Sequence, residues 1–142
     1  MRIAVSLDTY KFVDPDNLTA QVSSFAFTRG SLIKSEIAVV KNGRKIELDS
    51  GQDIEYYITS ATDYSVLYAG GASASSFSLI NSGVDAVYEG NISITSSALT
   101  SAFSSGTVLT ALANFEIRIM GPALFQQSFE PVIATIHNAK NP

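Results

Sequence analysis

Hydrophobic and polar residues alternate with a period of two in several segments of this chain. The clearest case is Phe115, Ile117 and Ile119, which alternate with Glu116 and Arg118. Because successive side chains of a β-strand point to opposite faces, this pattern predicts a strand that covers a core on one side. Phe115 and Ile117 are therefore predicted core residues. Substitution of Glu116 or Arg118 on the other face is expected to change stability by less than about 1 kcal/mol.

Similar alternation runs through residues 33–39, 54–59 and 132–137, and turn signals lie between the segments. Asn42-Gly43 separates two apolar stretches and favours a two-residue hairpin, because a type I′ turn needs positive φ at both central residues. Other glycine-containing pairs divide the remainder at strand-like intervals. The sequence predicts strands near residues 2–7, 21–28, 32–40, 45–48, 53–59, 64–69, 76–80, 85–94, 113–120 and 125–136, the last bent or split at Pro131.

One short helix is predicted near residues 96–103, where Ser96 or Ser97 can cap it and Leu99 and Phe103 share one face. Many short strands with one helical turn are typical of an all-β antiparallel sandwich, either jelly-roll or immunoglobulin-like. No linker divides the 142 residues, so residues 1–142 are predicted to form a single domain. The small-residue stretches 70–78 and 103–110 are predicted to be mobile loops.

The surface of this domain is expected to be polar but weakly charged. Charged residues make up 15% of the chain, against about 25% in typical soluble domains. The net charge is −4, and the only basic grouping, Lys41, Arg44 and Lys45, flanks the predicted hairpin. Nucleic acid is therefore not an expected partner. Low charge suits packing against other subunits, although it also suits an ordinary extracellular β domain.

Residue types that carry out catalysis are sparse. The chain has no cysteine and a single histidine, His137, which is predicted to be a solvated strand end. No phosphate-binding glycine motif is present. Asp14-Pro15-Asp16-Asn17 is typical of a tight turn, with an irregular calcium site as the less favoured alternative. We therefore predict no catalytic, cofactor-binding or metal-binding residues, and a protein that is not an enzyme.

The membrane is not an expected partner either. The segment from Met1 to Tyr10 contains Asp8 and lacks the apolar stretch of a signal peptide. No apolar run approaches the roughly 18 residues of a membrane span. Synthesis in the cytoplasm is the expectation that follows.

Tyr56, Tyr57, Tyr64 and Tyr68 crowd one predicted hairpin and form the candidate interface. Adjacent Tyr56 and Tyr57 must point to opposite faces, so at most one of them lies in the core. Packing in the core, a protein interface and a platform for sugar rings all remain open for these tyrosines.

From Phe25 to about Val132 the order of turns and strands is similar to that of a known family. Phe27-Thr28-Arg29-Gly30-Ser31 precedes an alternating strand, and residues 42–48 supply a hairpin and a short apolar strand. Residues 90–99 and 115–119 then resemble a strand, a short helix and another alternating strand. In this layout the chain resembles the amino-terminal domain of phage baseplate upper proteins and related short phage β-sandwich proteins. Ser31 and Lys45-Ile46-Glu47 depart from the acidic and proline-containing versions of that pattern.

This resemblance implies a component of the bacteriophage virion, such as a tail, baseplate, fibre or head accessory subunit. Its expected partners are other virion proteins, with copies of the chain arranged as a homo-oligomer within the particle. The alternative is a carbohydrate-binding or adhesin module that uses the tyrosines at 56–68. No cofactor is expected under either hypothesis.

Overall fold

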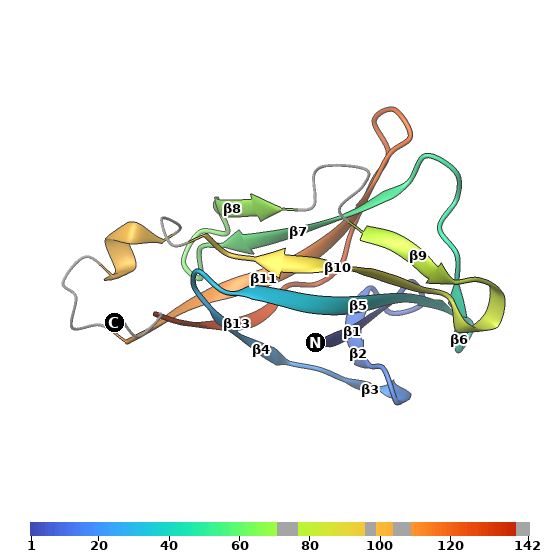
Figure 1. Ribbon diagram of the computed structural model, residues 1–142, viewed down its shortest axis with the longest axis horizontal. Helices are drawn as coiled ribbons and strands as arrows, with labels where there is room; N and C mark the ends of the chain where they lie inside the picture. Colours follow the sequence, from blue (N-terminus) through green and yellow to red (C-terminus); the bar gives the residue numbers. More distant parts are fainter. Residues whose placement is uncertain (71–76, 96–98, 104–108, 139–142) are drawn as a thin grey trace.

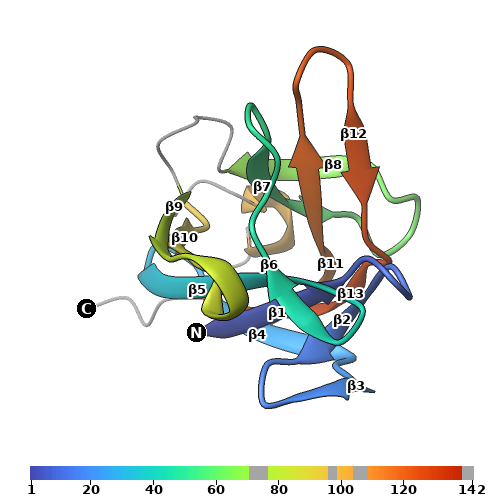
Figure 2. The ribbon, with the colours of Figure 1, turned by 90° about the vertical axis from the view of Figure 1, so that its right-hand side faces the viewer.

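The fold consists of two β-sheets that face each other, as the ribbon of the computed structural model shows (Figures 1 and 2). The structure describes residues 1–70, 77–95, 99–103 and 109–138. The β-sandwich class predicted from alternation and turn signals is confirmed.

The first sheet, sheet A, has the strand order β3-β2-β1-β5-β10-β9, and β6 also pairs with β5. Its edges are therefore β3 and β9. The strands are β1 (Arg2–Ser6), β2 (Lys11–Asp14), β3 (Asn17–Gln21), β5 (Leu32–Lys41), β6 (Arg44–Ile46), β9 (Phe77–Asn81) and β10 (Val87–Ser93).

The second sheet, sheet B, has the order β4-β13-β11-β7-β8, and β12 also pairs with β11. Its edges are β4 and β8. The strands are β4 (Ser24–Thr28), β7 (Asp53–Thr59), β8 (Val66–Gly70), β11 (Thr110–Met120), β12 (Gln126–Ser128) and β13 (Val132–His137). The predicted split of the last strand at Pro131 is confirmed, because β12 and β13 flank that residue.

Both sheets are mixed rather than purely antiparallel. β1 runs parallel to β5, with Ile3 opposite Ile37, and β4 runs parallel to β13, with Phe27 opposite Ile136. Parallel neighbours need a crossover connection, and the chain makes it by leaving sheet A after β3, forming β4 in sheet B and returning as β5. Side-chain alternation is the same in both strand directions, so the sequence pattern could not reveal these two pairings.

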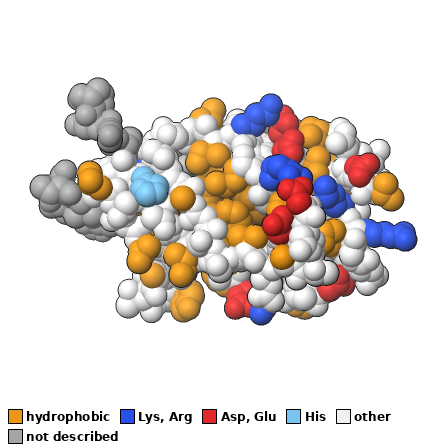
Figure 3. Space-filling view, turned by 90° about the horizontal axis from the view of Figure 1, so that it is seen from below, with side chains coloured by type: hydrophobic (Ala, Val, Ile, Leu, Met, Phe, Trp, Pro, Cys, Tyr) orange, Lys and Arg blue, Asp and Glu red, His pale blue; other side chains and the backbone are white. Residues whose placement is uncertain are grey.

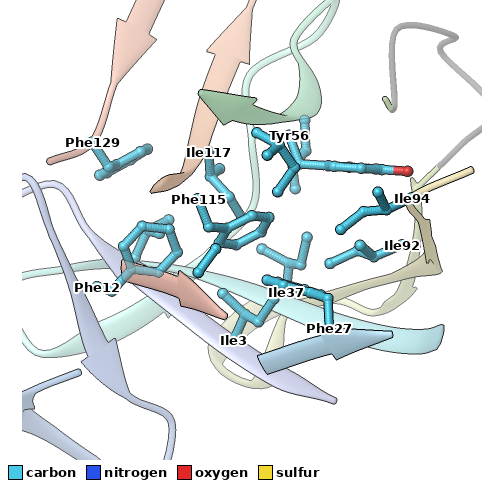
Figure 4. Close-up of a cluster of buried hydrophobic side chains, with 14 of the residues drawn as sticks. Ile3, Phe12, Phe27, Ile37, Tyr56, Ile92, Ile94, Phe115, Ile117 and Phe129 are labelled. Carbon is cyan, nitrogen blue, oxygen red and sulfur yellow. The ribbon is translucent and has the colours of Figure 1, made fainter. Parts of the chain in front are cut away.

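The core lies between the sheets and is centred on Phe115 of β11, which has no exposed surface (Figure 4). The ring centroid of Phe115 is 4.9 Å from that of Phe27 and 5.6 Å from that of Phe12, so three strands meet at this side chain. Ile117 is also fully buried. The prediction that Phe115 and Ile117 belong to the core is confirmed.

A second, smaller apolar cluster lies on the outer face of sheet A. Ala38 and Val40 of β5 point away from the main core and are nevertheless buried, together with Ala4 and Val13. Leu18 of β3 packs against this cluster. The centre of β5 is therefore buried on both faces, unlike a strand with one solvated side.

Local turns follow the sequence signals. Asn42 and Gly43 have φ values of 53° and 72° and connect β5 to β6, which confirms the predicted type I′ hairpin. The predicted helix at 96–103 extends over residues 96–98, which lie outside the described residues. Its described part, Thr100–Phe103, is a 3-10 helix. Most of the predicted mobile loops, at 71–76 and 104–108, lies outside the described residues as well.

Candidate functional site

Tyr56 belongs to the core, so the structure removes it from the candidate interface. Only 3% of its surface is exposed, because β7 points this side chain inward. Its hydroxyl donates to the Ser93 carbonyl at 3.1 Å and accepts from the Ser93 N–H at 3.0 Å. Burial raises the pKa of Tyr56 to about 12, and the hydrogen bond with Ser93 opposes part of that rise. Tyr56 thereby connects sheet B to the end of β10 in sheet A.

Tyr57 lies on the outer face of sheet B in a polar cluster. The Arg118 guanidinium lies over its ring, 3.9 Å from the centroid, and the Tyr57 hydroxyl donates to the Glu55 carboxylate. Burial, followed by this hydrogen bond to Glu55, raises the pKa of Tyr57.

Glu116 and Arg118 are not the freely solvated pair that alternation predicted. Glu116 is only 7% exposed, and its carboxylate accepts from Arg118 Nε at 2.8 Å and from Nη2 at 3.3 Å. Tyr57 covers the guanidinium from above. The premise of that expectation, a solvated face, is wrong for Glu116, and removal of Arg118 would leave a buried carboxylate without its partner. Opposite charges two residues apart on one strand face were the sequence signal for this pair.

The remaining two tyrosines lie apart from Tyr57. Tyr68 is half-buried, and its ring centroid is 6.2 Å from that of Tyr56 on the core side. Tyr64 is 64% exposed and lies in the loop between β7 and β8. The four tyrosines therefore form no common row, and contact between a partner and Tyr57, Tyr64 or Tyr68 stays a prediction.

Tyr64 borders a groove of about 340 Å³ that is lined by residues of both sheets. The end of β3 contributes Gln21, the β3–β4 connection contributes Ser23, and β11 contributes Asn114. Lys11 and Glu130 also line the groove, with the ammonium nitrogen 3.7 Å from a carboxylate oxygen. No sequence signal connects these residues, because Tyr64, Asn114 and Glu130 come from segments far apart in the chain.

Large apolar side chains are exposed on the β11–β12 hairpin and on the edge strands β8 and β9. The β11–β12 hairpin projects from the upper side of Figures 1 and 2, and Leu124 at its tip is 99% exposed. The edge strands β8 and β9 lie on this upper side too. We call this the apolar edge surface; it consists of the exposed residues Val66, Leu67, Leu79, Ile80, Leu124 and Phe125.

The opposite side, where β3 and β4 lie, combines hydrophobic and charged side chains (Figure 3). Charged residues gather toward one end, and His137 lies toward the other. His137 is exposed at the end of β13, as predicted for a solvated strand end.

The Asp16 N–H donates to Asp14 Oδ1 at 2.8 Å, which confirms the tight turn between β2 and β3.

Within residues 1–70, 77–95, 99–103 and 109–138, no three acidic or histidine side chains gather as ligands for a metal ion. No helix in that part of the chain is long and apolar enough to cross a membrane.

No family model matches the sequence, and no curated protein matches it. Among solved structures, the chain is similar to one described as the N-terminal domain of phage TP901-1 ORF48. The two chains are 13% identical, the match covers 96% of each chain, and the TM-score is 0.44.

Proposed function

We propose that this chain is a structural subunit of a bacteriophage virion that binds neighbouring proteins without turning over a substrate. The observation that carries the proposal is the apolar edge surface, where Leu124 is fully exposed and Phe125, Val66 and Ile80 are exposed as well. Exposed leucine and phenylalanine at the tip of a projecting hairpin lose contact with water when a partner covers them, which favours association.

The free edges of the sheets add a second means of binding. β8 and β9 have no strand neighbour on their outer sides among the described strands, so their outward N–H and C=O groups are open to a further strand. A neighbouring protein that adds a strand there gains main-chain hydrogen bonds, and Leu67 and Leu79 supply apolar contacts beside them. The low charge content reduces repulsion between closely packed copies.

The phage context is supported by the similarity between the order of turns and strands in this sequence and that of baseplate upper protein amino-terminal domains. In that context the partners are other virion proteins, with several copies of the chain related by the symmetry of the particle. The finished protein then resides in the virion after synthesis in the cytoplasm of the host.

The proposal is tested on particles purified from the phage or prophage that encodes this chain. Quantitative mass spectrometry should find the chain in a fixed ratio to the major capsid or tube protein, compatible with rotational symmetry. Replacement of Leu124 by serine should lower that ratio. Leu112→Ser is the matched control, because Leu112 is also exposed (70%) but lies on the outer face of sheet B. Absence of the chain from purified particles would overturn the proposal.

A further inference from the structure

The groove beside Tyr64 has the features of a binding site for a small ligand. Its volume of about 340 Å³ lies at the lower end of the range for such sites, roughly 300–1,000 Å³. Its lining combines apolar side chains, among them Val132 and Ile133, with amide, hydroxyl and charged groups. The β7–β8 loop supplies Tyr64 to this groove from a different part of the chain.

Tyr64 is held in place by its own loop. Its φ of 59° is in the left-handed region, which residues other than glycine seldom adopt. The Tyr64 N–H donates to the Ser60 carbonyl at 3.0 Å, and the Ser60 N–H donates to the Ser65 carbonyl at 2.8 Å. Asp63 accepts from the N–H and the hydroxyl of Ser65, and these hydrogen bonds lower the pKa of Asp63. Binding of a ligand on the Tyr64 ring therefore costs little conformational entropy of the β7–β8 loop, because the loop is already ordered.

The polar groups around the groove have hydrogen-bonding capacity to spare. Asn114 Nδ2 donates to the Ser60 carbonyl at 3.2 Å, which leaves its Oδ1 to accept. The 3.7 Å between Lys11 and Glu130 is an ion-pair distance but too long for a hydrogen bond, so both groups can still bond to a ligand. The Gln21 side chain lines the groove, is exposed, and offers both a donor and an acceptor.

These features select a class of ligand. Lys11 and Glu130 cancel each other's charge, so the groove does not favour an anion or a cation. A purely apolar ligand would cover the amides of Gln21 and Asn114 without pairing them, which is costly. A sugar ring has an apolar face for the Tyr64 ring and hydroxyl groups around its rim for the amides and the ion pair.

We propose that the groove between Tyr64, Gln21 and the Lys11–Glu130 pair binds a short neutral saccharide, with one sugar ring stacked on Tyr64. This site is separate from the apolar edge surface. Its occupation does not depend on whether the chain is part of a virion.

The test is titration of the ¹⁵N-labelled chain with neutral saccharides, followed by nuclear magnetic resonance. The panel contains glucose, galactose, mannose, rhamnose, N-acetylglucosamine and N-acetylgalactosamine, as free sugars and as short oligomers, each to about 10 mM, which detects millimolar dissociation constants. Saturable shifts of Gln21, Ser23, Tyr64 and Asn114 resonances are expected with at least one of them.

Variants decide whether the tyrosine ring carries the binding. Tyr64→Phe keeps the ring and should keep the affinity within about threefold, whereas Tyr64→Asn should weaken binding about tenfold or more. Asparagine tolerates a left-handed backbone better than most residues, so this variant should still fold. Tyr10→Asn is the matched control, because Tyr10 is also exposed and has a φ of 58° but does not line the groove.

Three outcomes would overturn the inference. The first is the absence of shifts at the groove with every sugar of the panel. The second is equal binding by Tyr64→Asn and the parent protein. The third is competition for the same resonances by a proline-rich peptide that binds more tightly than any sugar, which would make the groove a peptide site.

Discussion

Gly70→Ala is expected to destabilise the protein, because Gly70 leaves room for the ring of Tyr56. The two residues are opposite each other in the β7–β8 pairing. A Cβ atom at position 70 would overlap Cζ and the hydroxyl oxygen of Tyr56 and would lie 2.6 Å from its Cε2 atom, whereas carbon atoms in contact are about 3.5–4.0 Å apart. Tyr56 cannot easily move aside, because its hydroxyl is bonded to both backbone groups of Ser93.

The size of the effect has two parts. An extra methyl group in a packed core costs about 1–3 kcal/mol. Displacement of the Tyr56 ring would also leave the Ser93 N–H and carbonyl without their partner, at a cost of about 1–3 kcal/mol. The free energy of unfolding should therefore fall by about 2–5 kcal/mol, a large part of the roughly 5–15 kcal/mol that a domain of this size has.

A double-mutant cycle in urea, followed by far-ultraviolet circular dichroism, measures this coupling. In a Tyr56→Leu background the colliding atoms are gone, so Gly70→Ala should be neutral or stabilising by about 0.5–1 kcal/mol. Gly43→Ala is the control, because a Cβ there meets nothing within 4 Å and only its φ of 72° opposes the change. An equal loss of stability from Gly70→Ala in both backgrounds would refute this role of the tyrosine ring.

Three other predictions concern the same two sheets. Arg118→Ala should lower stability by about 3 kcal/mol by leaving the Glu116 carboxylate buried and unpaired, and replacement of both by leucine should restore most of the loss in denaturant melts. Phe115→Asp should prevent folding, as judged by circular dichroism, while Leu112→Asp at an exposed position of the same strand should be tolerated. The raised pKa of Tyr56 should make stability fall by up to about 1.4 kcal/mol per pH unit between pH 10 and about 12, since only the unfolded chain ionises there; Tyr56→Phe should abolish that part of the slope.

Side-chain alternation predicted the fold class because it reports burial directly. Phe115 and Ile117 lie at inward positions of β11, and the sandwich follows from several such strands. The parallel pairing of β1 with β5 could not be predicted from the sequence, because strand direction depends on the path of the chain rather than on the alternation of side chains. The continuous apolar run from Ile37 to Val40 did carry a signal that both faces of β5 are covered, as the second cluster shows.

The candidate site was harder to predict than the fold. Neighbouring residues in the sequence predict which face of a strand is buried, but the groove at Tyr64 depends on Gln21 at the end of β3 and on Glu130, which precedes β13. Neither residue is near Tyr64 in the sequence. Burial of Glu116 likewise depends on Tyr57 of the adjacent strand, which covers the guanidinium of Arg118.

Tyr56 and Tyr64 show why residue type could not separate the core from the surface in this chain. Tyr56 occupies an inward strand position, so its buried hydroxyl needs a hydrogen-bonding partner. The backbone of Ser93 at the end of β10 supplies both a donor and an acceptor. Tyr64 lies eight residues later, where a turn and a left-handed backbone take the side chain out of the strand pattern. The hydrogen bonds of the loop, rather than the alternation of a strand, set the direction of the Tyr64 side chain. For that reason alternation could not predict where the ring lies, and for the same reason the ring is free to contact a ligand.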